Sequence, residues 1–214
     1  MKTIKFLCFA IVLFSSGAEA AGFRIDAFMG TAHNLDSRIT VYQSGETTLK
    51  KTADWCTCPF EQAPYYSLRV GFGKDGGGWE IEMLHHKITL RNTDTLISRF
   101  RATFGYNFFF VNHAWTVSGL QLRLGAGPII AHPSSTVRAK AFEGMEGGIL
   151  NGKYFLVGFG MQFAVGKRFE IWKGFSFNLE GKMTVGYANL PIAEGMATTP
   201  NYAFHGLGGF GYAF

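Results

Sequence analysis

The sequence predicts an all-β protein, an eight-stranded antiparallel transmembrane β-barrel with the up-and-down order of a meander. Reading back from Phe214, every second residue is aromatic or very small, which is the pattern of a strand with one apolar face. Similar segments recur along the chain, and most reach the roughly 9–11 residues that a tilted membrane strand needs. After residue 20 there is no apolar run long enough for a membrane helix. Strands that cross a membrane must close into a barrel, because lipid cannot satisfy unpaired backbone groups.

Residues 1–20 are typical of a secretory signal peptide that is cleaved from the mature chain. Two lysines precede the apolar run Phe6–Phe14, and Ala18-Glu19-Ala20 provides a small-x-small cleavage site. We therefore expect residues 21–214 to form the barrel. Removal of the signal's two lysines and one glutamate leaves 18 basic and 14 acidic residues over 194 positions, a net charge of +4. This charge is too small to favour nucleic-acid binding.

The first three strands are expected at 22–35, 65–73 and 78–90. Their apolar faces are, in order, Phe23, Ile25, Ala27 and Met29; Leu68, Val70 and Phe72; and Trp79, Ile81 and Met83. In the third strand the alternation is lost near His85 and His86, where we expect a β-bulge. Two adjacent histidines on a strand point to opposite faces, so they do not favour a shared metal ion.

The fourth strand is expected at 97–110, and its alternation is the clearest of the early strands. Phe100, Ala102, Phe104, Tyr106 and Phe108 are predicted to face lipid. The opposite face, with Arg99, Arg101, Thr103, Gly105 and Asn107, is predicted to face the lumen. An arginine on the lipid side would cost about 2–4 kcal/mol at the bilayer midplane, which favours this register.

The last four strands are expected at 115–132, 153–166 and 175–188 and in the segment that ends at Phe214. The long connections 36–63, 133–151 and 189–201 alternate with the short ones at 74–77, 111–114 and about 172–174, while 91–96 is of intermediate length. Alternation places the long loops at one end of the barrel, as in proteins with extracellular loops and periplasmic turns. Both termini are then expected in the periplasm.

The even strand number, the aromatic strand ends and the terminal Phe214 resemble the small outer-membrane barrels of Gram-negative bacteria, of the OmpA, OmpX and OmpW kind. The resemblance implies a bacterial outer-membrane location, contact with lipopolysaccharide, and insertion by the barrel-assembly machinery through the C-terminal strand. A secreted soluble sandwich or lipocalin-like barrel is the alternative. It fits less well, because its apolar face would point inward.

The predicted lumen collects charged side chains of both signs: Asp26, Arg69, Glu80, Glu82, Arg99, Arg101, Arg123, Glu180 and Lys182, with Arg24 nearer the rim. Buried charges are costly unless they are paired and hydrogen-bonded. We therefore expect an ion-pair network that fills the lumen, since an eight-stranded barrel is only wide enough for its own side chains. A gated polar pore is the functional alternative.

His132-Pro133-Ser134 at the end of the fifth strand, followed by Glu143 and Glu146, has the residue types of an esterase triad. The spacing is similar to that of the PagL family of lipid A deacylases. That resemblance implies His132 as the base, Ser134 as the nucleophile and Glu146 as the orienting acid. The family's His-x-Ser element lies near the end of the chain, whereas here three more strands follow. A solvated loop is the alternative.

Loop 36–63 contains the two cysteines of the mature chain, Cys56 and Cys58. Export favours their oxidation, whereas a zinc site usually needs four ligands, so no metal or cofactor is expected. The segment 39–42 followed by Gly45 predicts that a hairpin continues above the membrane. Lys50, Lys51 and Trp55 in this loop are candidates for contact with lipopolysaccharide.

These observations predict an integral outer-membrane barrel with a structural or surface-interaction role in its extracellular loops. A lipid A esterase is the first alternative. A narrow channel for small or apolar solutes is the second. No enzymatic activity is assigned from the sequence.

Overall fold

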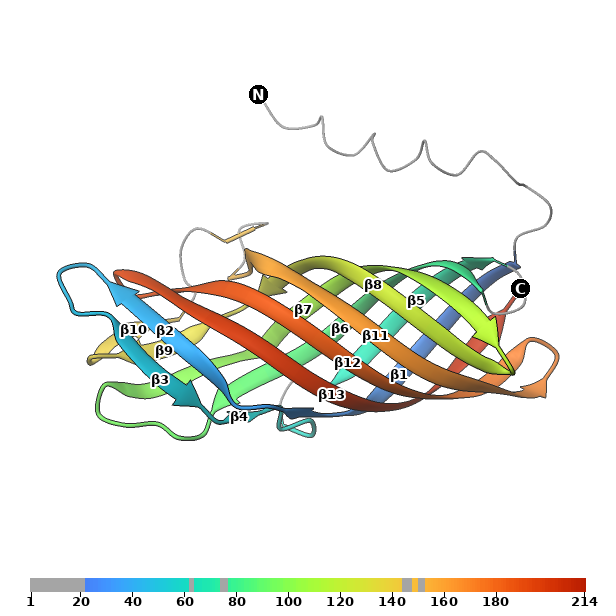
Figure 1. Cartoon of the computed structure of the whole chain (residues 1–214), viewed down its shortest axis with the longest axis horizontal. Coiled ribbons are helices and arrows are strands. Elements are labelled where there is room, and N and C mark those ends of the chain that lie inside the picture. Colours follow the sequence, from blue (N-terminus) through green and yellow to red (C-terminus); the bar gives the residue numbers. More distant parts are fainter. Residues whose placement is uncertain (1–21, 62–63, 74–76, 144–147, 150–152) are drawn as a thin grey trace, which may run out of the picture.

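The computed structural model describes residues 22–61, 64–73, 77–143, 148–149 and 153–214. Within these residues thirteen strands form one sheet (Figure 1). Eight of them build the barrel wall: β1 (Gly22–Asn34), β5 (Tyr66–Gly73), β6 (Gly78–Leu90), β7 (Ile97–Val117), β8 (Leu120–Ala131), β11 (Phe155–Trp172), β12 (Phe175–Ile192) and β13 (Gly195–Ala213). The five short strands are β2 (Ser37–Gln43), β3 (Leu49–Ala53), β4 (Trp55–Cys56), β9 (Ser134–Val137) and β10 (Lys140–Phe142). The expected signal peptide and Glu146 lie outside the described residues.

The eight wall strands close into a ring, which confirms the predicted antiparallel meander. Each wall strand pairs antiparallel with the next wall strand along the chain, from β1–β5 through to β12–β13. The last strand returns to the first, with Ala213 opposite Arg24 and the backbone N–H of Phe214 donating to the carbonyl of Phe23. Among the described residues, no helix has the length and apolar character to cross a membrane.

Tight turns lie at the end of the barrel where β1 begins and where the C-terminus is found (Figure 1). Ser118 and Gly119 join β7 to β8 with φ values of 52° and 78°, the left-handed conformation that two-residue hairpins require. The strand therefore continues through residues 111–114, where a turn was expected.

The opposite end of the barrel extends into longer hairpins. The predicted hairpin near residues 39–45 is confirmed as β2–β3, and β9–β10 forms a second one. The expected loop at 189–201 is wrong, because β12 and β13 remain paired as far as Ile192 and Gly195. This pairing persists because Leu190, Ile192 and Ala197 are buried inside the extended barrel.

The outer surface of the wall is apolar on every long strand. Exposed side chains include Ile25, Met29, Leu68, Ile81, Val111, Leu124, Phe159, Met161, Phe163, Leu179, Val185, Phe204 and Phe210. Near the tight turns the exposed side chains become aromatic: Trp79, Trp115, Trp172, Tyr212 and Phe214. An apolar band that ends in an aromatic girdle is the surface that a bilayer requires of a barrel.

The predicted register of the fourth strand is wrong at its outer half. Phe100, Ala102, Tyr106 and Phe108 are buried in the interior, although Phe104 faces outward as expected. Gly105, with φ of 133°, lies in an irregular stretch where the β6–β7 register shifts between His86 and Ile88. The bulge expected near the histidines is thus present.

A second bulge changes the register of β11. The β8–β11 register shifts between Leu156 and Gly158, so Val157 is buried, although it was expected to face lipid. Beyond the bulge Phe159, Met161 and Phe163 face outward as predicted. The interior therefore has two layers: a charged layer near the turns, and an apolar core near the hairpins that includes Ile39, Trp55, Ile88, Phe100, Phe108, Val157 and Leu190.

Candidate functional site

The charged layer crosses the lumen as a continuous set of ion pairs. Arg69 on β5 reaches Glu180 on β12, with 2.7 Å between Nη2 and Oε1. Arg123 on β8 bridges Glu80, at 2.8 Å from Nε to Oε2, and Glu180, at 2.8 Å from Nη1 to Oε2. All four side chains are almost completely buried. The network joins strands from opposite sides of the ring.

Glu82 is the most heavily coordinated carboxylate in this layer. It pairs with Lys182 and, at 3.3 Å, with Arg69. Asn112 and Gln162 donate further hydrogen bonds to its Oε2 at 3.0 and 2.8 Å. Nearly all the acceptor capacity of this buried carboxylate is used, which offsets the cost of removing it from water.

A smaller group of charges continues the network toward the turns. Asp26 pairs with Arg24 and with Arg168, each at 3.1 Å, and Arg24 also contacts Glu80. The sequence pattern placed Arg24 at the rim and did not include Arg168. Arg168 lies two residues after the inward-facing Gly166, so the alternation of β11 predicts that Arg168 also faces inward.

Arg99 and Arg101 do not belong to the network, and their expected lumen position is wrong. They lie on the outer side of β7, because their neighbour Phe100 packs in the apolar core against Trp55 with 5.9 Å between the ring centroids. In this half of the barrel the interior is apolar, so the aromatic residue takes the inward position. Arg99 instead pairs with Glu143 at the rim.

Hydrogen-bonded polar residues separate the charged layer from the apolar core. The ring of His205 contacts the hydroxyl groups of Tyr65 and, at 2.8 Å, of Thr184. The side-chain oxygen of Asn34 lies 3.0 Å from His86 Nε2 and accepts a hydrogen bond from Asn201 at 2.9 Å. The sequence pattern did not single out Asn34.

Ser134 and Glu143 of the candidate esterase group are in contact at the hairpin end. The Ser134 hydroxyl donates to Glu143 Oε2 at 3.1 Å. Partial burial opposes ionisation of Glu143, but hydrogen bonds from Arg99 and Ser134 hold its pKa below the usual value. Glu146, the acid that the resemblance implied, lies outside the described residues.

His132 lies beyond the end of β8 and packs between aromatic rings. Its ring centroid is 5.4 Å from that of Phe104 and 5.3 Å from that of Tyr154. Partial burial lowers the pKa of His132, so its neutral form dominates at pH 7. Within the described part of the chain, no hydrogen bond joins His132 to Ser134 or Glu143.

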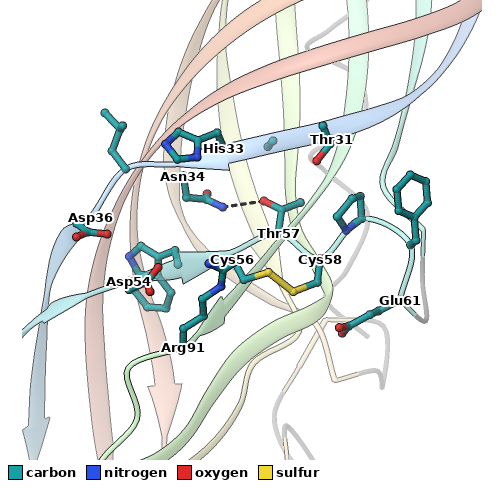
Figure 2. Close-up of a pocket in the computed structure, with 15 residues that line it drawn as sticks. Thr31, His33, Asn34, Asp36, Asp54, Cys56, Thr57, Cys58, Glu61 and Arg91 are labelled. Atoms are coloured by element: carbon teal, nitrogen blue, oxygen red, sulfur yellow. Dashed lines mark hydrogen bonds between the residues drawn. A yellow bond between two sulfur atoms is a disulfide. The ribbon is translucent and has the colours of Figure 1, made fainter.

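A pocket of about 880 Å³ opens in the barrel wall between β1 and the segment 54–61 (Figure 2). Cys56 and Cys58 form a disulfide there, with 5.5 Å between their Cα atoms. Thr57 between them accepts a hydrogen bond from Asn34 Nδ2 at 2.7 Å. In the residues that the structure describes, no group of three or more His, Cys, Asp or Glu side chains could hold a metal ion.

No protein-family model and no curated protein sequence matches the chain. Solved outer-membrane proteins are similar in structure. OprG from Pseudomonas aeruginosa is 14% identical, with 91% of this chain and 96% of OprG covered and a TM-score of 0.45. AlkL in lipid bilayers is 12% identical, with 94% and 93% covered and a TM-score of 0.47. Neisserial surface protein A is 9% identical, with 92% and 99% covered and a TM-score of 0.43.

Proposed function

We propose that the chain is an integral barrel of the bacterial outer membrane, with a closed lumen and a role in surface interactions at its hairpin end. The apolar outer surface and the aromatic girdle support membrane insertion. The termini lie at the end with tight turns, which supports a periplasmic location for them. The C-terminal strand, ending at Phe214, is the segment that we propose the assembly machinery recognises.

The observation that carries this proposal is the filled lumen. Three cations and three carboxylates from β5, β6, β8 and β12 meet there: Arg69, Arg123, Lys182, Glu80, Glu82 and Glu180. Each is buried, and the charges are equal in number. An eight-stranded barrel has little interior space beyond its own side chains. This arrangement supports a structural plug and disfavours a channel for solutes.

The hairpin end offers a surface for lipopolysaccharide. Arg99 and Arg101 face outward on β7, where β9 pairs with it. Guanidinium groups bind phosphate in a bidentate manner, and lipopolysaccharide carries phosphate groups. We therefore propose that these two arginines, rather than Lys50, Lys51 and Trp55, are the main contacts to the lipid.

Two measurements on the refolded protein test the proposal. In planar bilayers the protein should produce no conductance steps, and in detergent it should bind purified lipopolysaccharide saturably. Replacing Arg99 and Arg101 by glutamine should weaken binding at least tenfold. Lys167→Gln, an exposed cation at the turn end, is the matched control and should leave binding unchanged. Regular single-channel steps would contradict the closed lumen, and equal effects of both variants would contradict the binding site.

The contact between Ser134 and Glu143 supports a second candidate function, a lipid A esterase. The Glu143 carboxylate accepts a hydrogen bond from the Ser134 hydroxyl, and His132, whose pKa is lowered by burial, precedes Ser134 by two positions in the sequence. The activity requires His132 to reach Ser134 when lipid is bound, because a serine nucleophile needs a general base. Mass spectrometry of lipid A should then reveal one lost acyl chain in expressing cells. Ser134→Ala should abolish that loss, whereas the inward-facing Ser135→Ala should preserve it.

A further inference from the structure

We propose that the wall pocket beside the disulfide is a binding site for an aliphatic polyamine. The pocket is separate from the lumen network and from the Ser134 group. Its walls are formed by residues 31–36 at the end of β1 and by the segment 54–61 (Figure 2). Arg91 completes the lining.

The pocket exists because strand pairing stops on this side of the barrel. The β1–β5 ladder ends where Met29 lies opposite Tyr66, and in the described part of the chain β4 pairs with β6 and not with β1. The Asn34–Thr57 hydrogen bond spans the gap at its base. Asn34, Trp55 and Thr57 are buried and form the floor, so the pocket opens to the outside.

The pocket lining contains more acidic than basic side chains. Among the twelve Asp and Glu side chains that the structure describes, eight form ion pairs with described partners: Asp26, Glu46, Glu80, Glu82, Asp94, Glu143, Glu180 and Glu194. The other four, which have no ion pair within 4 Å among the described residues, are Asp36, Asp54, Glu61 and Glu170, and the first three line this pocket. Lys87 lies near Glu61, because its ammonium group donates to the Glu61 carbonyl oxygen at 3.4 Å and attracts the Glu61 carboxylate. Arg91 is the cation in the lining, so the acidic and basic side chains of the lining have a net charge of −2.

The positions of these carboxylates indicate which kind of cation the pocket would bind. Figure 2 shows Asp36 and Asp54 on one side of the disulfide and Glu61 on the other. The described residues contain no group of three ligands around one point, so a single metal ion is not favoured. Separate carboxylates along a pocket of about 880 Å³ suit an extended molecule with more than one ammonium group.

Apolar residues in the same lining suit the carbon chain between ammonium groups. Trp55 and Pro59 contribute to the pocket, and Phe60 at its edge is 91% exposed. An aromatic ring attracts an ammonium group placed over its face. Contact with these apolar surfaces would stabilise the methylene segments of a bound polyamine, while its ammonium groups remain near the carboxylates.

Isothermal titration calorimetry on the folded protein in a zwitterionic detergent, with spermidine as the probe, tests this inference. We expect saturable binding, and no binding of the uncharged 1,8-octanediol. The double variant Asp54→Asn/Glu61→Gln should weaken spermidine binding at least tenfold. Glu170→Gln is the matched control and should leave affinity unchanged, because among the described carboxylates without an ion pair Glu170 is the one outside the pocket. A heat-modifiability gel establishes that each variant is folded.

Three outcomes would overturn the inference. The first is the absence of saturable spermidine binding by the wild-type protein. The second is an equal loss of affinity in Glu170→Gln, which indicates unspecific attraction to surface charge. The third is unchanged affinity in the folded double variant, which places the bound polyamine elsewhere.

Discussion

Arg69 and Glu180 meet across the barrel, 111 residues apart in the chain, and their side chains are joined by two hydrogen bonds of 2.7 and 2.9 Å from one guanidinium nitrogen. The same guanidinium lies 4.9 Å above the ring of Phe28. Arg69 is therefore fixed from three strands, β1, β5 and β12. It is the residue whose removal should affect the lumen network most.

Replacing Arg69 by methionine should destabilise the barrel strongly. The variant leaves Glu82 and Glu180 with one cationic partner fewer in a buried site, and breaking a buried ion pair typically costs about 3–5 kcal/mol. Urea unfolding of the protein in lipid vesicles, followed by tryptophan fluorescence, measures this change. Lys167→Met at the outer surface is the control. A loss below about 1 kcal/mol would mean that the network rearranges around the missing cation.

Gly160 should not tolerate a side chain, because Phe108 occupies the space beside it. A Cβ atom at Gly160 would lie 2.4 Å from Cε1 of the Phe108 ring, which is packed in the core. Overpacking of this kind typically costs about 1–3 kcal/mol, so Gly160→Ala should lower the unfolding free energy by that amount. Gly206→Ala is the matched control, since no atom lies within 4 Å of its added Cβ. Equal stability of the two variants would contradict the inward position of Phe108.

The meander order and the positions of the main strands were predictable from alternation, and ring closure was predictable because every backbone group must be paired in lipid. In β12 and β13 one face is lipid-facing and the other lines the lumen along much of the strand. The character of each side chain therefore indicates its side, with Leu179 outside and Glu180 inside. The charged layer was predictable for the same reason. A charged side chain in the interior of a membrane barrel is stabilised mainly by pairing with a side chain of opposite charge.

The outer half of β7 could not be predicted in this way. There the barrel continues past the charged layer, and its interior is apolar. Phe100 therefore faces the interior and Arg99 faces outward, which is the reverse of the orientation expected for a strand in lipid. Alternation indicates that the two faces of a strand differ in polarity, but it does not indicate which face lies inside the barrel. That choice depends on Trp55 and Ile88, which come from other parts of the chain.

The corrected register of β7 can be tested by cysteine labelling. In a background with Cys56 and Cys58 replaced by serine, Arg99→Cys should react with a water-soluble maleimide in intact cells, because Arg99 faces outward at the rim. Phe100→Cys should remain unlabelled until the protein is unfolded, because Phe100 is 2% exposed. Mass spectrometry of the purified protein measures the modified fraction. The reverse labelling pattern would restore the register that the sequence alone suggests.

The disulfide should stabilise the segment 54–61 that lines the wall pocket without supporting the rest of the barrel. Cys56 pairs with Thr89 of β6, whereas Cys58 lies outside the strands, and Thr57 between them bonds to Asn34 of β1. Replacing both cysteines by serine should therefore increase hydrogen exchange in residues 54–61 at least tenfold, while exchange in β12 stays unchanged. Thr57→Val keeps the disulfide and removes the bond to Asn34, so it should produce a smaller increase confined to the same segment. Faster exchange in β12 of the double-serine variant would show instead that the disulfide stabilises the whole barrel, because β12 is distant from it in the ring.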